Sequence, residues 1–203
     1  MFNIAVDNDW LVKNPVKSST RFPEKNYTVR YLTRDEETRL YEALPEFLRP
    51  IVTVALNTGL RKRNILDLKW DAVDYQFRTL EVLDNKGNKF IKIFMNDVLY
   101  NLFKELPKVA ESDYIFPNPK NNEPYNDSYI KRAWNKAKAD ACINDFRFHD
   151  LRHTVGTRLA QSNIPVPVIK ELLAHSDIKT TMRYVHTASS QMKEAMSVLN
   201  SFN

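Results

Sequence analysis

The chain has 203 residues, 43% hydrophobic and 27% charged, a balance typical of soluble globular proteins that can build a sizeable core. Its formal net charge of +5 favours polyanionic partners, but only weakly by itself. With three glycines and neither a GxGxxG nor a GxxxxGK[ST] pattern, the common phosphate-binding loops are excluded. A single cysteine, Cys142, no signal peptide and no membrane-length apolar run predict a protein of the reducing cytoplasm that does not contact a membrane.

Residues 1–32 show little periodicity. Their segment NPVKSSTRFPEKNYTVR combines two prolines with four basic side chains and other polar residues, a composition that favours loops. We therefore predict a tail and a linker over residues 1–32 and a separate domain over residues 33–203. A chain that begins in this way resembles a fragment of a longer protein.

The pattern becomes helical at Thr33. Thr33 and Glu36 have the spacing of a capping box, and the residues after them place apolar side chains on one helical face. The apolar run LRPIVTVALNT then ends at Gly59, which is a plausible C-cap. Residues 61–70 continue as a short helix or a turn.

The periodicity shortens between Val73 and Met95. FRTLEVL and KFIKIFM have the character of strands, and the turn-rich DNKGN joins them. Helices should follow in the second half of the chain, over residues 97–104, 127–141, 149–162, 166–174, 177–184 and 189–200, the first two capped by Asn96 and Asn126. The predicted fold class is mainly α with one small antiparallel β-sheet (α+β).

The stretch HDLRHT crowds two histidines and an arginine into five positions. His149 and His153 are four residues apart and could hold a metal on one helical face, but Asp150 stands where the metalloprotease pattern requires glutamate. A third ligand with suggestive spacing is also missing, so we expect neither a metal nor another cofactor. Taken alone, the motif equally allows a buried polar role for His153 and a solvated Arg152.

Three other segments carry reactive or basic side chains. TGLRKRN contains Arg61, DNKGNK contains Lys86 and Lys89, and LLAHSDIKTTMRYVH contains His175 nine residues before Tyr184. Each has an ordinary structural explanation. Arg61 could neutralise helix-end carbonyls, the lysines could be solvated at a hairpin tip, and Tyr184 could be half-buried in the core.

Together, however, the order arginine, hairpin lysine, His-x-x-Arg, histidine and tyrosine resembles the tyrosine recombinase family of phage integrase type. TGLR, KGNK, HDLRHT and AHSDIKTTMRY match its signature blocks in order, and the resemblance covers roughly residues 30 to 190. AVDNDWLVKNPV is similar to the last helix of that family's separate core-binding domain. The chain departs from the family at Ala174, where glycine is usual, at Asn64, where an acid is common, and at Lys92–Met95, where Val-Pro-Leu is usual.

The resemblance implies metal-independent cleavage of DNA, in which Tyr184 attacks the scissile phosphate, leaves a 3′-phosphotyrosyl bond and expels a 5′-hydroxyl. A free tyrosine has a pKa near ~10, so only about one in a thousand is ionised at neutral pH. The attack therefore needs help with the phenolic proton and with the charge that develops on phosphorus. Arginines can supply paired hydrogen bonds to the nonbridging oxygens.

The resemblance also assigns roles to the other residues. Arg61 and Arg152 should hold the phosphate, and His175 should donate a hydrogen bond to it. His149 should lie near the tyrosine and assist its deprotonation, while Lys86 should protonate the leaving 5′-oxygen. Lys89 is the alternative to Lys86, because the hairpin register is uncertain. Asp150 and His153 should orient the cluster, with His153 pointing inward.

The function implied is that of a site-specific DNA recombinase that integrates or excises a mobile element, working in the cytoplasm at the nucleoid. Its expected partners are double-stranded DNA and further copies of itself, in a tetramer on DNA. Residues 189–203 could either pack on their own domain or exchange between the subunits of this tetramer. One alternative is a catalytically inactive DNA-binding or architectural protein on the same scaffold, and another is a type IB topoisomerase. Three further tyrosines compete with Tyr184 in principle, but none follows a histidine at the family spacing: Tyr114, Tyr125 and Tyr129.

Overall fold

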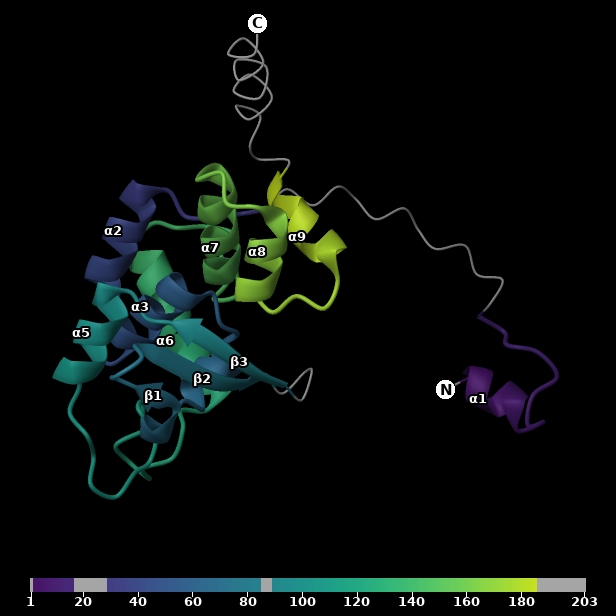
Figure 1. The fold of residues 1–203 in the computed structure, drawn as a ribbon, viewed down its shortest axis with the longest axis horizontal. Coiled ribbons are helices and arrows are strands. Elements are labelled where there is room, and N and C mark those ends of the chain that lie inside the picture. The colour runs from purple at the N-terminus through teal and green to yellow at the C-terminus, as the bar shows by residue number, and fades with distance from the viewer. Residues whose placement is uncertain (1, 17–28, 85–88, 186–203) are drawn as a thin grey trace, which may run out of the picture.

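The computed structural model describes residues 2–16, 29–84 and 89–185 (Figure 1). The helices are α1 (Phe2–Asp7), α2 (Arg34–Ala43), α3 (Leu48–Thr58), α4 (Lys62–Leu66), the 3-10 helix η1 (Trp70–Ala72), α5 (Asp97–Glu105), α6 (Asp127–Asp140), α7 (Asp150–Gln161), α8 (Val166–Leu172) and α9 (Ile178–Val185). The strands are β1 (Val73–Asp74), β2 (Thr79–Asp84) and β3 (Lys89–Phe94). The predicted class, mainly helical with a small antiparallel sheet, is confirmed.

The sheet has the order β1-β2-β3, with both pairs antiparallel. The predicted hairpin is its larger part, and its register places Leu80 opposite Ile93. We did not predict β1, because two residues are too short to show an alternating pattern. β2 begins two residues later than expected, since Arg78 adopts a left-handed backbone with a φ of 51°.

Local hydrogen bonds set the predicted helix ends. The Thr33 hydroxyl accepts a hydrogen bond from the amide of Glu36, whose carboxylate accepts one from the amide of Thr33, so the capping box is present. Gly59 ends α3 in the left-handed region, with a φ of 66°. Asn96 and Asn126 cap α5 and α6 through their side chains.

Two groups of buried residues hold the domain together. The large cluster fills the space between α2, α3, α5, α6 and the sheet, and its members include Leu48, Ile51 and Phe103. The small cluster lies where α7, α8 and α9 meet, and consists of Val29, Val155, Ala160, Ile169, Leu173 and Tyr184. Figure 1 shows α7, α8 and α9 grouped together on one side of the domain. Since α7 contributes Leu151 to the large cluster and Val155 to the small one, it joins the two.

The ends of the chain are described in part. α1 has no buried residue and covers only the start of the segment similar to a core-binding helix, whose remainder forms turns and bends. The predicted helix over residues 189–200 lies outside the described residues. Within residues 2–16, 29–84 and 89–185, no helix is both long enough and apolar enough to cross a membrane.

Candidate active site

The HDLRHT motif forms the start of α7, the most buried helix around the site. Asp150 is 1% exposed, and its carboxylate accepts a hydrogen bond of 2.7 Å from the backbone amide of Arg147. This contact fixes the turn that enters α7, and the carboxylate at the first helical turn also interacts favourably with the helix dipole. The motif therefore has a rigid base, which suits a site that must hold several side chains in register.

Arg152 is buried, with 4% of its surface exposed, which excludes a position on a solvated face. Its Nη1 donates a hydrogen bond of 2.7 Å to the carbonyl of Gly59, and its Nη2 donates to the carbonyl of Leu173. These residues are the C-caps of α3 and α8, whose carbonyl ends carry partial negative charge. The guanidinium thus ties three helices together while it supplies a positive charge to the site.

Arg61 lies at the N-cap of α4, two residues after the acceptor Gly59. Its positive charge contributes to lowering the pKa of both His149 and His175, which places it in the same electrostatic neighbourhood as Arg152. The structure therefore brings together the two arginines that the family pattern would use on a phosphate.

Tyr184 is the largest of the fully buried side chains, and its surface is 0% exposed. Its Oη lies 2.9 Å from Nδ1 of His153, and its ring stacks on His175 with 6.2 Å between centroids. The ring also lies against Gly156, where a Cβ would come within 2.5 Å of it. Burial raises the pKa of Tyr184, although the positive charge of Arg152 acts in the opposite direction.

His175 follows α8 and holds its place through a side-chain contact. Its Nδ1 lies 2.8 Å from the hydroxyl of Thr181, which is fully buried on α9. Burial, followed by the charges of Arg152 and Arg61, lowers the pKa of His175 to about 4. The imidazole is therefore neutral at pH 7.

His149 packs its ring edge-on against His153, with 5.2 Å between centroids. Burial, followed by the charge of Arg152, lowers the pKa of His149. Sequence reasoning placed His149 next to the tyrosine and gave His153 only a supporting position. In the structure the hydrogen-bonding partner of Oη is Nδ1 of His153, because α9 packs against the part of α7 one turn further along. The i, i+4 spacing puts both histidines on one face but does not say which of them α9 meets.

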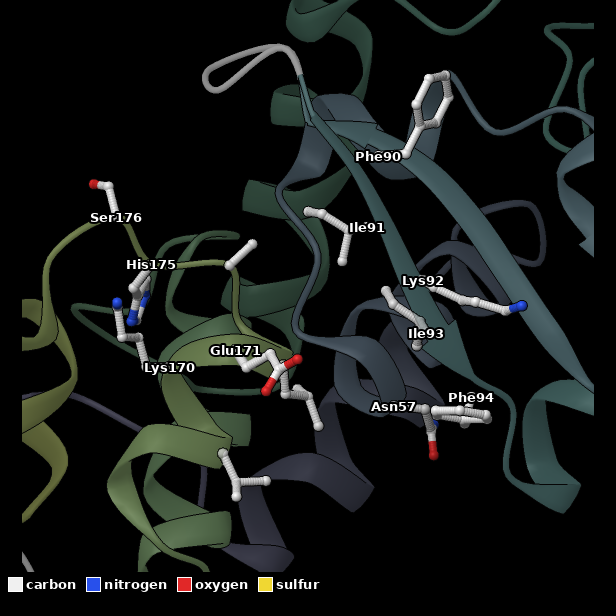
Figure 2. A pocket seen from close by; sticks show the side chains of 13 residues that line it. Asn57, Phe90, Ile91, Lys92, Ile93, Phe94, Lys170, Glu171, His175 and Ser176 are labelled. Atoms are coloured by element: carbon white, nitrogen blue, oxygen red, sulfur yellow. The ribbon is translucent and has the colours of Figure 1, made fainter.

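The predicted general acid, Lys86, lies outside the described residues, and its alternative, Lys89, begins β3. Both assignments remain predictions. A groove of about 800 Å³ borders the site, with β3 as one wall and α8 with the turn after it as the other (Figure 2). His175 and Ser176 lie on the α8 side of this groove, and Phe90 and Ile91 lie on the β3 side.

A metal was not expected from the sequence. Across the described ranges 2–16, 29–84 and 89–185, no group of three or more histidine, cysteine or acidic side chains could hold a metal ion. In the HDLRHT motif itself, Asp150 faces Arg147 and His153 faces Tyr184. Each of these two side chains thus contacts a different partner.

Comparison with known proteins identifies the relatives of this fold. Residues 30–191 match the model of the phage integrase family. The chain belongs to this family. The integrase of Salmonella phage P22 is 30% identical over 204 residues, an alignment that covers 94% of this chain and 52% of that protein. The chain therefore spans about half the length of this relative.

Solved structures of similar fold include two integrases bound to DNA. The Tn1549 transposon integrase in complex with transposon right end DNA gives a TM-score of 0.77 at 17% identity, covering 97% of this chain and 75% of that one. A lambda integrase tetramer bound to a Holliday junction gives a TM-score of 0.66 at 23% identity, covering 87% of this chain and 55% of that one. These likenesses confirm the phage integrase catalytic fold that the motifs predicted.

Two departures from the phage integrase pattern have a local explanation. Ala174, where glycine is usual, has a left-handed backbone with a φ of 48°, a conformation that favours glycine and that alanine adopts at a modest cost. Asn64, where an acid is common, is buried, and its side-chain amide donates a hydrogen bond of 3.2 Å to the carbonyl of Leu83. A carboxylate could not make this contact, because it has no proton to donate.

Proposed function

We propose that this chain is the catalytic part of a site-specific DNA recombinase that cleaves and rejoins strands through a 3′-phosphotyrosyl bond on Tyr184. The observation that carries the proposal is the convergence of Tyr184, His153, His175 and Arg152 in one buried site. Membership of the phage integrase family supports the same reaction. Integration or excision of a mobile element is the proposed biological outcome.

The roles follow from the chemistry of each group. Arg61 and Arg152 hold the nonbridging oxygens of the scissile phosphate, since guanidinium groups donate paired hydrogen bonds that an ammonium group cannot match in geometry. His175 donates a further hydrogen bond to that phosphate. His149, beside Arg152 at the start of α7, contacts the substrate phosphate or the tyrosine. Lys86, or Lys89 in its place, protonates the leaving 5′-oxygen.

Double-stranded DNA and further copies of the chain are the proposed partners. Support comes from a relative of the same fold, lambda integrase, solved as a tetramer bound to a Holliday junction. We propose that residues 189–203, which lie outside the described residues, exchange between subunits on DNA. Sedimentation of a chain truncated after Ala188, on DNA, tests this exchange. An unchanged assembly would contradict it.

The segment before the domain belongs to the same proposal. Residues 1–32 are the end of an upstream core-binding domain and a linker, and residues 33–203 are the catalytic domain. Val29 is 5% exposed and packs in the small cluster, so the packing of the domain already includes the last residues of this linker.

An inactive DNA-binding protein on the same scaffold is the alternative function. Duplexes selected for binding from a random-sequence pool, then nicked near the bound site, would trap a covalent intermediate on denaturing gels. We expect an adduct with the natural chain and none with Tyr184→Phe. Tyr129→Phe is the matched control, because Tyr129 is partly exposed on α6 and should leave the adduct intact. Binding without an adduct would favour the alternative.

A further inference from the structure

His153 is a side chain of the site to which the family's set of roles gives no chemical task. It lies one helical turn after His149 on α7, and its Nδ1 is 2.9 Å from the nucleophilic oxygen of Tyr184. The centroids of the two rings are 5.9 Å apart and the rings are tilted by 57°. The 2.9 Å between Nδ1 and Oη is a distance at which a side chain can take a proton from the group it contacts.

The surroundings of His153 keep its ring neutral. Burial is the main reason that the pKa of His153 falls to about 4, and nearby positive charge adds to it. The titratable or charged groups that face it come from its own helix, from the turn before it, from α9 and from the turn after α8: His149, Asp150, Arg152, Arg147, Tyr184 and His175. A neutral imidazole carries one bare nitrogen, and with the proton on Nε2 that nitrogen is Nδ1. Nδ1 can then accept the phenolic hydrogen.

The tyrosine is held in place for this transfer. Gly156 allows its ring to lie directly against α7, and the ring also stacks on His175, which is itself hydrogen-bonded to Thr181. These contacts fix the ring so that Oη points at His153. A nucleophile and its base held within hydrogen-bond reach by further packed groups form the usual arrangement for activating a weak nucleophile.

We propose that His153 is the general base that deprotonates Tyr184 during strand cleavage, an inference that rests on the proposed function. The phenolic proton passes to Nδ1 of His153 as a lone pair of Oη forms the bond to phosphorus. The bond between phosphorus and the 5′-oxygen breaks, and its electron pair stays on that oxygen, which takes a proton from the lysine general acid. Rejoining runs the same transfers in reverse.

This assignment separates the two histidines of the motif. His153 contacts the reacting oxygen, whereas His149 contacts the ring of His153 and lies within the field of Arg152. His149 is then available to the phosphate.

The test is the pH dependence of adduct formation on nicked duplexes, measured for the natural chain, His153→Gln and His149→Gln. With a neutral base in place, the rate should change little between about pH 6 and 8. Without the base, attack depends on the small ionised fraction of tyrosine, which grows about tenfold per pH unit below its pKa. We therefore expect His153→Gln to be slower by about 10²–10⁴-fold at pH 7 and to recover as the pH rises. His149→Gln should be slower without recovering.

Controls separate chemistry from folding. Thr157→Val alters a buried side chain one turn further along α7 and should leave the pH profile unchanged. Histidine ¹⁵N NMR is measured on the natural chain, so its result cannot be affected by misfolding of a His153 variant. It should show an unprotonated Nδ1 at pH 7 that responds to Tyr184→Phe, and a protonated Nδ1 would overturn the proposal.

The outcomes also distinguish this inference from the proposed function. If the natural chain forms no adduct on DNA that it binds, the proposed function fails and this inference fails with it. If the adduct forms and depends on Tyr184, but the ratio of natural to His153→Gln rates is the same at every pH, only the role of His153 is overturned.

Discussion

The large and the small cluster are built from the same kinds of side chain but have different roles. The large cluster packs α2, α3, α5, α6 and the sheet, and none of its buried side chains is predicted to react. The small cluster joins α7, α8 and α9 and contains Tyr184, the proposed nucleophile. A reactive side chain in the small cluster can be displaced by changes that leave the rest of the fold intact. The position of Tyr184 and the stability of the domain should therefore respond to different substitutions.

A matched pair of truncations tests this difference most directly. Ile51 in the large cluster and Ile169 in the small cluster are both 1% exposed or less. Ile51→Ala should lower the free energy of unfolding by an amount near the upper end of about 2–5 kcal/mol, because its surroundings cannot collapse. Ile169→Ala should lower the free energy of unfolding by an amount near the lower end of that range. It should nevertheless slow adduct formation more than Ile51→Ala does. Urea unfolding and adduct assays below the transition measure the two effects.

If Ile51→Ala and Ile169→Ala lost the same amount of stability and the same amount of activity, the two clusters would not have separate roles. The comparison uses one residue type throughout, so differences in side-chain chemistry do not enter.

Arg152 connects the two clusters, since it bonds to Gly59 at the end of α3 and to Leu173 at the end of α8. Arg152→Lys keeps the charge but cannot reproduce both contacts and a paired grip on a phosphate. We expect adduct formation to fall by about 10²–10³-fold. Stability should also fall, by about 1–3 kcal/mol, because a buried carbonyl loses its donor.

Arg158→Lys on the same helix is the control, because Arg158 pairs with Glu37 near the surface and should change stability by only about 0.5 kcal/mol. If Arg152→Lys and Arg158→Lys lowered adduct formation and stability by similar amounts, Arg152 would have no specific role in the site.

Gly156→Ala probes the small cluster alone. Alanine is favoured over glycine in a helix by up to about 1 kcal/mol, but its Cβ would meet the Tyr184 ring at 2.5 Å. We expect the clash to dominate and to lower the free energy of unfolding by about 1–3 kcal/mol. Adduct formation should also slow, because the ring must move away from His153. In a Tyr184→Ala background the same change should stabilise the protein. Stabilisation in both backgrounds would mean that the ring does not rest on Gly156.

The helix ends could be predicted because short-range hydrogen bonds set them. Thr33 with Glu36, Gly59, Asn96 and Asn126 each end or begin a helix where the sequence indicated. β1 was missed because its pairing depends on β2 rather than on its own pattern. The starting point of β2 was wrong for a related reason, since the left-handed turn at Arg78 shortens the strand.

The site shows the same division. Motif order named Arg152, His175 and Tyr184, which the structure brings together, while the assignment of Lys86 stays a prediction. It could not show that Arg152 is bonded to the carbonyl ends of two helices, or that His153 rather than His149 meets Oη. Those contacts depend on how α9 is rotated and placed against α7. They are tertiary facts, which the local sequence does not encode.

The histidines of the site should also make stability depend on pH. The pKa of His153 and of His175 falls to about 4 in the folded chain, and that of His149 is also lowered, whereas an unfolded histidine titrates near ~6.5. Between these values only the unfolded chain binds the proton, so stability is complete above about pH 6.5 and is lost as the pH falls toward 4. Each histidine can contribute at most about 1.4 kcal/mol per pH unit in this window.

Urea midpoints between about pH 7 and 5 measure this loss, and His153→Gln should make the decline shallower by the share of one histidine. Glu36 does not interfere. Its hydrogen bond with Arg30 lowers the pKa of its carboxyl, so its contribution to stability disappears only at more acidic pH. An equal decline in the natural chain and in His153→Gln would mean that the ring beside Tyr184 titrates as it does in water. The neutral imidazole that the proposed general base requires would then be absent from the weakly acidic range.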